Sequence, residues 1–85
     1  MFRISDSIRS TSTQDGEILL DVRQGQILAL NRTGSRIFQM LERGLDPNQI
    51  ADEISREFAV NIAEVHADVL GFIESLEKCD VLKAG

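Results

Sequence analysis

The spacing of apolar residues changes once along this 85-residue chain, at Asn31. Before Asn31 they tend to recur at every second residue, which is typical of half-buried β-strands. After it they recur at every third or fourth residue, which is typical of amphipathic helices. A chain whose strands all precede its helices favours an antiparallel sheet covered by helices on one face. The sequence therefore predicts an α+β fold, a three-stranded antiparallel sheet followed by three helices, in a single domain over residues 1–85.

Three strands are expected before Asn31. The first has Phe2, Ile4 and Ile8 on one side, the second has Ile18, Leu20 and Val22 on one side with Leu19 opposite, and the third spans residues 26–30. The polar stretch STSTQDG separates the first two strands, and RQG separates the second from the third. Each stretch ends in a glycine, which adopts the positive φ of a tight turn without steric cost.

Three helices are expected after Asn31, at about residues 33–43, from Pro47 to the Val-Asn break at residues 60–61, and at about residues 62–79. The candidate N-caps are Asn31, Thr33 or Ser35 for the first helix, Asp46 for the second and Asn61 for the third. Residues 80–85 are expected to fray, with Val81 and Leu82 packing back. This order is similar to a winged helix-turn-helix with the wing moved to the front.

The net charge of −5 is concentrated in one half of the chain, because residues 1–45 carry +1 and residues 46–85 carry −6. An acidic half repels phosphate, so nucleic acid is not expected as a partner. No window approaches the roughly 18 apolar residues of a membrane span, and the first ten residues lack the apolar stretch of a signal peptide. We therefore expect a cytoplasmic protein with no membrane partner.

The reactive side chains are too few for a catalytic centre. Cys79 is the only cysteine and His66 the only histidine, so neither an internal disulfide nor a multi-cysteine metal site can form. The two residues also form no convincing nucleophile and base pair. We expect no enzymatic activity, no metal and no cofactor.

The third expected strand has none of the usual protection against pairing with another chain. Its sequence, QILAL, contains no charge and no proline, although it lies at an edge if the strands are ordered as in the sequence. Ile27 and Ala29 point to one face, and Leu28 and Leu30 to the other. An extended peptide could add to this edge as a fourth strand. A second copy of the chain could do the same, which leaves homodimerisation by strand pairing open.

The last expected helix has more apolar surface than one small sheet can cover. Its apolar arc is about 180° wide, whereas one packed face needs roughly 100°. The arc consists of Ile62, Val65, His66, Val69, Leu70, Phe72, Ile73, Leu76 and Cys79. The surplus either lines a groove beside the open strand or packs on the other two helices.

Three short motifs occur in order along the chain. They are LLD-x-R-x-G at residues 19–25, LN-x-TG at residues 30–34 and DV-x-x-FI-x-x-L at residues 68–76. With these motifs, residues 15–82 resemble the PqqD-like family, the precursor-peptide recognition elements of ribosomal peptide natural-product (RiPP) pathways. Phe38 stands where the family often has Trp. Residues 41–44 lack the Cys-Asp-Gly that members of the PQQ pathway often carry there.

The resemblance implies a non-catalytic RiPP recognition element that binds the leader segment of a precursor peptide by strand addition. It is most similar to the stand-alone protein of lasso-peptide biosynthesis, which works with a separate leader peptidase or other modifying enzyme. A PQQ-biosynthesis peptide chaperone is the alternative. The peptide-binding residues are then expected on the third strand and the last helix, at Gln26, Ile27, Leu28, Ala29, Leu30, Val65, Asp68, Val69, Phe72, Ile73 and Leu76.

A rival of another class is a winged-helix DNA-binding protein, which has a similar architecture. Such a protein needs a basic recognition helix, but residues 61–79 carry a net charge of −3. A purely structural subunit is the third possibility, and it would bind a folded protein and no short peptide.

Overall fold

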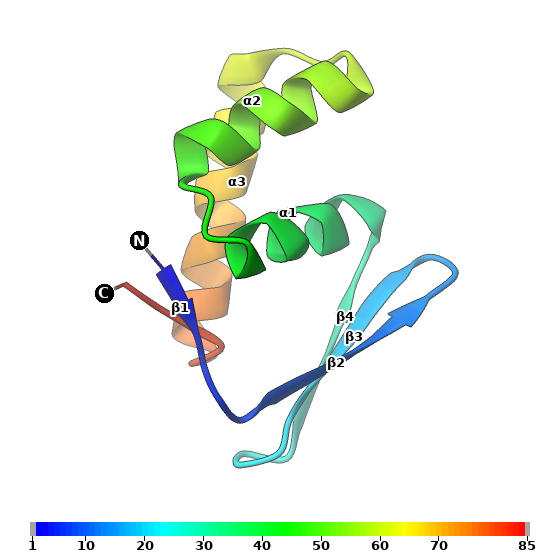
Figure 1. The fold of residues 1–85 in the computed structure, drawn as a ribbon, viewed down its shortest axis with the longest axis vertical. Coiled ribbons are helices and arrows are strands. Elements are labelled where there is room, and N and C mark those ends of the chain that lie inside the picture. Colours follow the sequence, from blue (N-terminus) through cyan, green and yellow to red (C-terminus); the bar gives the residue numbers. More distant parts are fainter. Residues whose placement is uncertain (1, 85) are drawn as a thin grey trace.

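The structure, a computed structural model, describes residues 2–84. Its elements, in chain order, are β1 (Phe2–Ile4), β2 (Ile8–Thr13), β3 (Gly16–Asp21), β4 (Gln26–Leu30), α1 (Arg32–Glu42), α2 (Pro47–Phe58), α3 (Ile62–Lys78) and β5 (Leu82–Ala84). Figure 1 shows α1 between the sheet and α2, with α3 running behind them towards the two chain ends. The predicted α+β class, with a three-stranded antiparallel sheet and three helices, is confirmed.

The three-stranded sheet has the order β2-β3-β4, and both of its connections are hairpins. Ile8 pairs with Asp21 and Thr13 with Gly16, so the whole STST part of the stretch expected in a loop belongs to β2. Serine and threonine are common in exposed strands, and threonine has high β-propensity, which explains why this polar stretch extends the ladder. The β3–β4 turn includes Gly25 at φ 67°, a left-handed conformation that favours glycine.

The expected first strand is divided between two sheets, so its prediction is wrong. Phe2–Ile4 form β1, which pairs with β5, whereas Ile8 begins β2. The expected fraying of the C-terminal tail is also wrong for residues 80–84, because Leu82–Ala84 form the partner strand. Val81 and Leu82 are buried, as their predicted packing required. β1 and β5, which lie near opposite ends of the chain, are therefore joined by main-chain hydrogen bonds.

The core lies between the inner face of the sheet and the three helices. Its buried apolar residues are Leu19, Ile37, Phe38, Met40, Leu41, Ile50, Ala51, Ile54, Val65, Val69, Ile73, Leu76, Val81 and Leu82. β3 contributes only Leu19 to this set, because its other inward side chains are the carboxylates of Glu17 and Asp21. Its apolar Ile18 and Leu20 point away from the helices and are exposed.

The predicted N-caps explain where the helices begin. Asn31 accepts a hydrogen bond from the Gly34 amide, and Asn61 accepts from Ala63 and Glu64. At α2, Asp46 and Gln49 form a reciprocal capping box, and Pro47 follows in the first turn, where it needs no N–H. Each cap satisfies amides that have no partner inside the helix. Asn31, rather than Thr33 or Ser35, is the cap of α1.

Candidate functional site

β4 has one unpaired edge. It pairs with β3 along its other edge, and within residues 2–84 no strand pairs with the outer one. A strand gives only part of its N–H and C=O groups to each neighbour, so β4 retains main-chain groups for another strand. Leu28 and Leu30 point inwards and are half-buried against the core, whereas Ile27 points outwards and is 70% exposed. The alternation predicted for this strand is confirmed.

α3 flanks β4 at both ends of the strand. Near the start of β4, the Gln26 side-chain amide donates a hydrogen bond of 3.3 Å to the Cys79 carbonyl that follows α3. Just beyond the end of β4, Gly34 lies so near Phe72 that a Cβ atom on the glycine would be 3.2 Å from the ring. The stretch of α3 from Phe72 to its end therefore lies beside β4. The unpaired edge and the Phe72 side of α3 form the two walls of the candidate site.

A cavity of about 470 Å³ lies among the three helices, next to the first turn of α1. It is lined by Thr33, Ile37, Ile54, Phe58, Val60, Glu64, Val65, Asp68 and Val69. The lining is mostly apolar, but Glu64 and Asp68 bring two carboxylates from α3. Phe58 and Val60 are partly exposed there, so their apolar surface is accessible to a ligand. The cavity can accept an apolar side chain, and its carboxylates favour a neighbouring cation.

The predicted site residues of α3 separate into two groups. Val65, Val69, Ile73 and Leu76 are buried in the core, with Val69 fully inaccessible. Asp68 is exposed and Phe72 is half-buried, so these two can meet a ligand directly. The wide apolar arc thus serves both purposes left open by the sequence, because one part packs on the other elements and another part faces the site. The arc could not show this division, since buried and site-facing apolar residues follow the same spacing.

Six of the nine residues that line the cavity are not among the predicted site residues. They are Thr33 and Ile37 of α1, Ile54 and Phe58 of α2, Val60 in the link to α3, and Glu64 of α3. The sequence predicts the break at residues 60–61 that ends α2, but not the direction of the turn. Ala59 ends α2 at φ 53°, a left-handed conformation for which the sequence gives no glycine signal, and this turn brings Phe58 and Val60 to α3.

Some of the charged and polar side chains of the helices pair with each other. Glu57 of α2 accepts two hydrogen bonds from Arg36 of α1, which lowers the pKa of Glu57 and raises that of Arg36. Arg56 pairs with Asp52 on the same helix. His66 lies 2.8 Å from Asn48. The Arg36–Glu57 and His66–Asn48 pairs link α2 to α1 and α3, whereas Glu64 and Asp68 have no cationic partner among the described residues.

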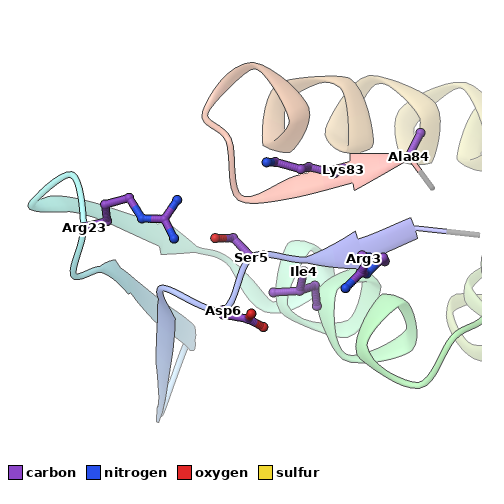
Figure 2. A pocket seen from close by; sticks show the side chains of 7 residues that line it. All are labelled: Arg3, Ile4, Ser5, Asp6, Arg23, Lys83 and Ala84. Carbon is purple, nitrogen blue, oxygen red and sulfur yellow. The ribbon is translucent and has the colours of Figure 1, made fainter.

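A second hollow lies at the opposite end of the sheet. It has a volume of about 280 Å³ and is lined by Arg3, Ile4, Ser5, Asp6, Arg23, Lys83 and Ala84. Figure 2 shows Arg23 reaching from the β3–β4 turn towards Ser5, with Lys83 on β5, the strand that pairs with β1. All three cations are exposed and Asp6 offsets part of their charge. This hollow lacks the apolar lining of the cavity among the helices.

The described residues offer no cluster of metal ligands, since no three His, Cys, Asp or Glu side chains in residues 2–84 lie together as such ligands would. In the same part of the chain, no helix is long and apolar enough to cross a membrane.

Comparison with known proteins gives the family. The model of the family described as coenzyme PQQ synthesis protein D (PqqD) matches residues 16–82, which is most of the chain. This protein belongs to the PqqD family. No match is found among curated protein sequences.

Two solved structures share the fold of this PqqD-family protein along nearly its whole length. One is TbiB1 in complex with the TbiA(beta) leader peptide, which is 32% identical, with a TM-score of 0.91 and coverage of 98% of this chain and 96% of that one. The other is lasso peptide synthetase B1 complexed with the leader peptide, which is 29% identical, with a TM-score of 0.90 and coverage of 98% of both chains. Both similar chains were thus solved with a leader peptide bound.

Proposed function

We propose that this protein is a non-catalytic carrier that binds the leader segment of a ribosomally made precursor peptide. The leader adds to β4 as a fourth strand, and the protein delivers it to a separate leader peptidase or other modifying enzyme of a lasso-peptide pathway in the cytoplasm. The observation that carries this proposal is the unpaired edge of β4 beside α3. It is supported by the two similar chains, each solved with a leader peptide.

The geometry suits an extended peptide, because a strand presents its side chains alternately to two faces. On a strand added to β4, one set of side chains would enter the space between Leu28 and Phe72. Main-chain hydrogen bonds to β4 would supply affinity that does not depend on the sequence of the peptide, and the pockets would supply selectivity. A peptide that continues beyond Leu30 would reach the cavity among the helices, whose carboxylates suit a basic residue of the leader.

The eleven predicted site residues take different roles in this proposal. Residues 26–30, Asp68 and Phe72 contact the leader directly. Val65, Val69, Ile73 and Leu76 lie beneath the surface and hold α3 at its distance from β4, because their side chains are buried. Phe58 and Val60, at the mouth of the cavity, are added to the contacts.

The alternative within the same family is a peptide chaperone of PQQ biosynthesis, for which the family model is named. Both readings use the same edge and differ in the peptide that is bound. Binding of a lasso-precursor leader, with no binding of a PQQ-precursor peptide at the same concentration, would decide for the lasso pathway.

The proposal is tested by titrating the isotope-labelled protein with the synthetic leader of the precursor that is encoded beside it. Amide shifts confined to residues 26–30, Asp68, Phe72 and the cavity are expected, and a scrambled leader should cause none. The variants Phe72→Ala and Leu70→Ala form a matched pair, because both lie on α3 but Leu70 is two residues away and so about 160° around the helix from Phe72. Only Phe72→Ala should weaken binding. No shifts at millimolar leader would refute the proposal.

A further inference from the structure

The face of the β2-β3-β4 sheet that points away from the helices is apolar. The register pairs Ile18 with Ala29 and Leu20 with Ile27, so these four outward side chains form a continuous group across two strands. We call them the outer patch. Ile18, Leu20 and Ile27 are 41%, 39% and 70% exposed. Exposed apolar side chains scattered singly are ordinary, whereas a contiguous group marks a site of interaction.

The charge of this face is opposite in sign to that of the whole chain. Arg9, which pairs with Leu20, is the charged residue at the outward positions of β2, β3 and β4. Its guanidinium donates hydrogen bonds to the main-chain carbonyls of Asp6 and Ile8, and among the described residues it has no carboxylate partner. The carboxylates of β3 point inwards and are buried. An otherwise acidic protein of net charge −5 therefore presents an apolar face with one free cation.

The outer patch is continuous with the proposed peptide site. Ile27 and Ala29 belong to β4, the strand to which the leader would add. Alternate side chains of an added strand would project on the same face, directly beside Ile27 and Ala29. The leader would thus extend the patch by one strand, and the extended face would exist only in the loaded protein.

We propose that the outer patch docks the folded enzyme that processes the leader, and that the bound leader completes the docking surface. This inference rests on the proposed function. The partner surface has an apolar centre that covers Leu20 and Ile27 and a carboxylate that pairs with Arg9. A second copy of this chain fits the patch less well, because packing face to face would bring two Arg9 side chains to one interface with no carboxylate. An enzyme docked in this way would distinguish loaded from empty carrier.

The test measures binding of the purified leader peptidase of the same pathway to this protein, with and without the synthetic leader. The variant Ile18→Thr/Leu20→Thr removes the β3 half of the patch, keeps strand-forming residues at two exposed positions and leaves β4, the strand to which the leader adds, unchanged. Leu70→Gln is the control, because it removes an exposed apolar side chain from α3. Arg9→Glu reverses the charge. Leader affinity and the thermal melting of each variant are measured in parallel.

The loaded wild type should bind the enzyme at least about tenfold more tightly than the empty protein. Ile18→Thr/Leu20→Thr and Arg9→Glu should each weaken that binding by about tenfold or more, while Leu70→Gln changes nothing. All variants should bind the leader like the wild type. Unchanged enzyme binding by both patch variants would overturn the inference, and so would a patch-dependent homodimer in sedimentation that leaves enzyme binding unaffected. If the wild type bound no leader, the proposed function would fail, and the variants measured against the enzyme alone would still decide whether this face docks it.

Discussion

Replacing Ile73 by valine tests the division of α3 into a core side and a site-facing side. Ile73 is 3% exposed, so the change removes one buried methylene group, which costs about 0.8 kcal/mol in lost burial. A small cavity adds to this, and Ile→Val changes typically cost roughly 0.5–1.5 kcal/mol. We therefore expect a loss of about 1 kcal/mol in the free energy of unfolding. In a domain of this size that corresponds to a melting temperature lower by about 4–8 °C. Leader affinity should be unchanged.

The neighbouring residue gives the opposite expectation. Phe72 is half-buried on the wall that faces β4, so Phe72→Ala should weaken leader binding by about 2 kcal/mol, or roughly thirtyfold. Calorimetric melting and fluorescence anisotropy with a labelled leader measure the two effects on the same samples. The reasoning is refuted if Ile73→Val weakens leader binding at an unchanged melting temperature, because Ile73 would then face the ligand.

Three further outcomes are expected. Gly34→Ala would ordinarily stabilise α1 by up to about 1 kcal/mol, but the new Cβ would lie 3.2 Å from the Phe72 ring. The melting temperature should therefore not rise, and leader binding should weaken. In a Phe72→Leu background the same change should raise the melting temperature. Asp46→Ala removes the capping box of α2 and should cost about 1 kcal/mol in chemical denaturation without affecting leader affinity. Burial alone would raise the pKa of Asp21, but hydrogen bonds from Ser7, Gln24 and Arg23 together hold this pKa below its ordinary 3.8. The stabilising contribution of Asp21 is therefore fully present above pH 3.8 and is lost as the pH falls through the lower pKa of the folded state. In a plot of the free energy of unfolding against pH, the fall on the acid side should be shallower for Asp21→Asn.

The elements with local signals could be predicted from the sequence. Asp46 followed by Pro47 and Asn61 before an apolar run mark helix starts by their own chemistry, since each cap satisfies amides within three residues of itself. The edge position of residues 26–30 was predicted for strands ordered as in the sequence, and the two short hairpins of the sheet give that order. These features depend on neighbours in the chain, which a sequence displays directly.

The pairing of β1 with β5 could not be predicted, because it depends on contact between opposite ends of the chain. Phe2 pairs with Ala84, and three-residue strands have too few residues to show an alternating pattern. The prediction joined Phe2 and Ile4 to Ile8 because their spacing is even. The turn at residues 5–7 interrupts the ladder, because the Ser5 amide donates to the Val81 carbonyl before β5, whereas the Ser7 carbonyl accepts from the Val22 amide after β3. Local alternation could not reveal that two strands follow one another there.

The faces of β3 could not be assigned either, because its pattern is the reverse of the usual one. Glu17 is buried and accepts hydrogen bonds from Ser35 and Gln39 of α1, and Asp21 is buried and accepts from the main chain of the β3–β4 turn. A buried carboxylate is stable only when such donors satisfy it. Those donors come from a helix and a turn that the strand sequence does not specify.

This inverted strand also bears on function. Folding alone favours apolar residues on the core side of β3, yet Ile18 and Leu20 lie on the exposed side while two carboxylates occupy the core side. Both carboxylates have a structural role there, because Glu17 accepts a hydrogen bond from Gln39 of α1 and Asp21 accepts one from Gln24 of the β3–β4 turn. The outward apolar residues have no such role inside the molecule, since polar β-formers such as threonine would keep the strand and expose less apolar surface to water. A docked protein would bury Ile18 and Leu20, which the fold leaves exposed. Because these residues lie beside β4, their contact with that protein would depend on whether a leader occupies the β4 edge.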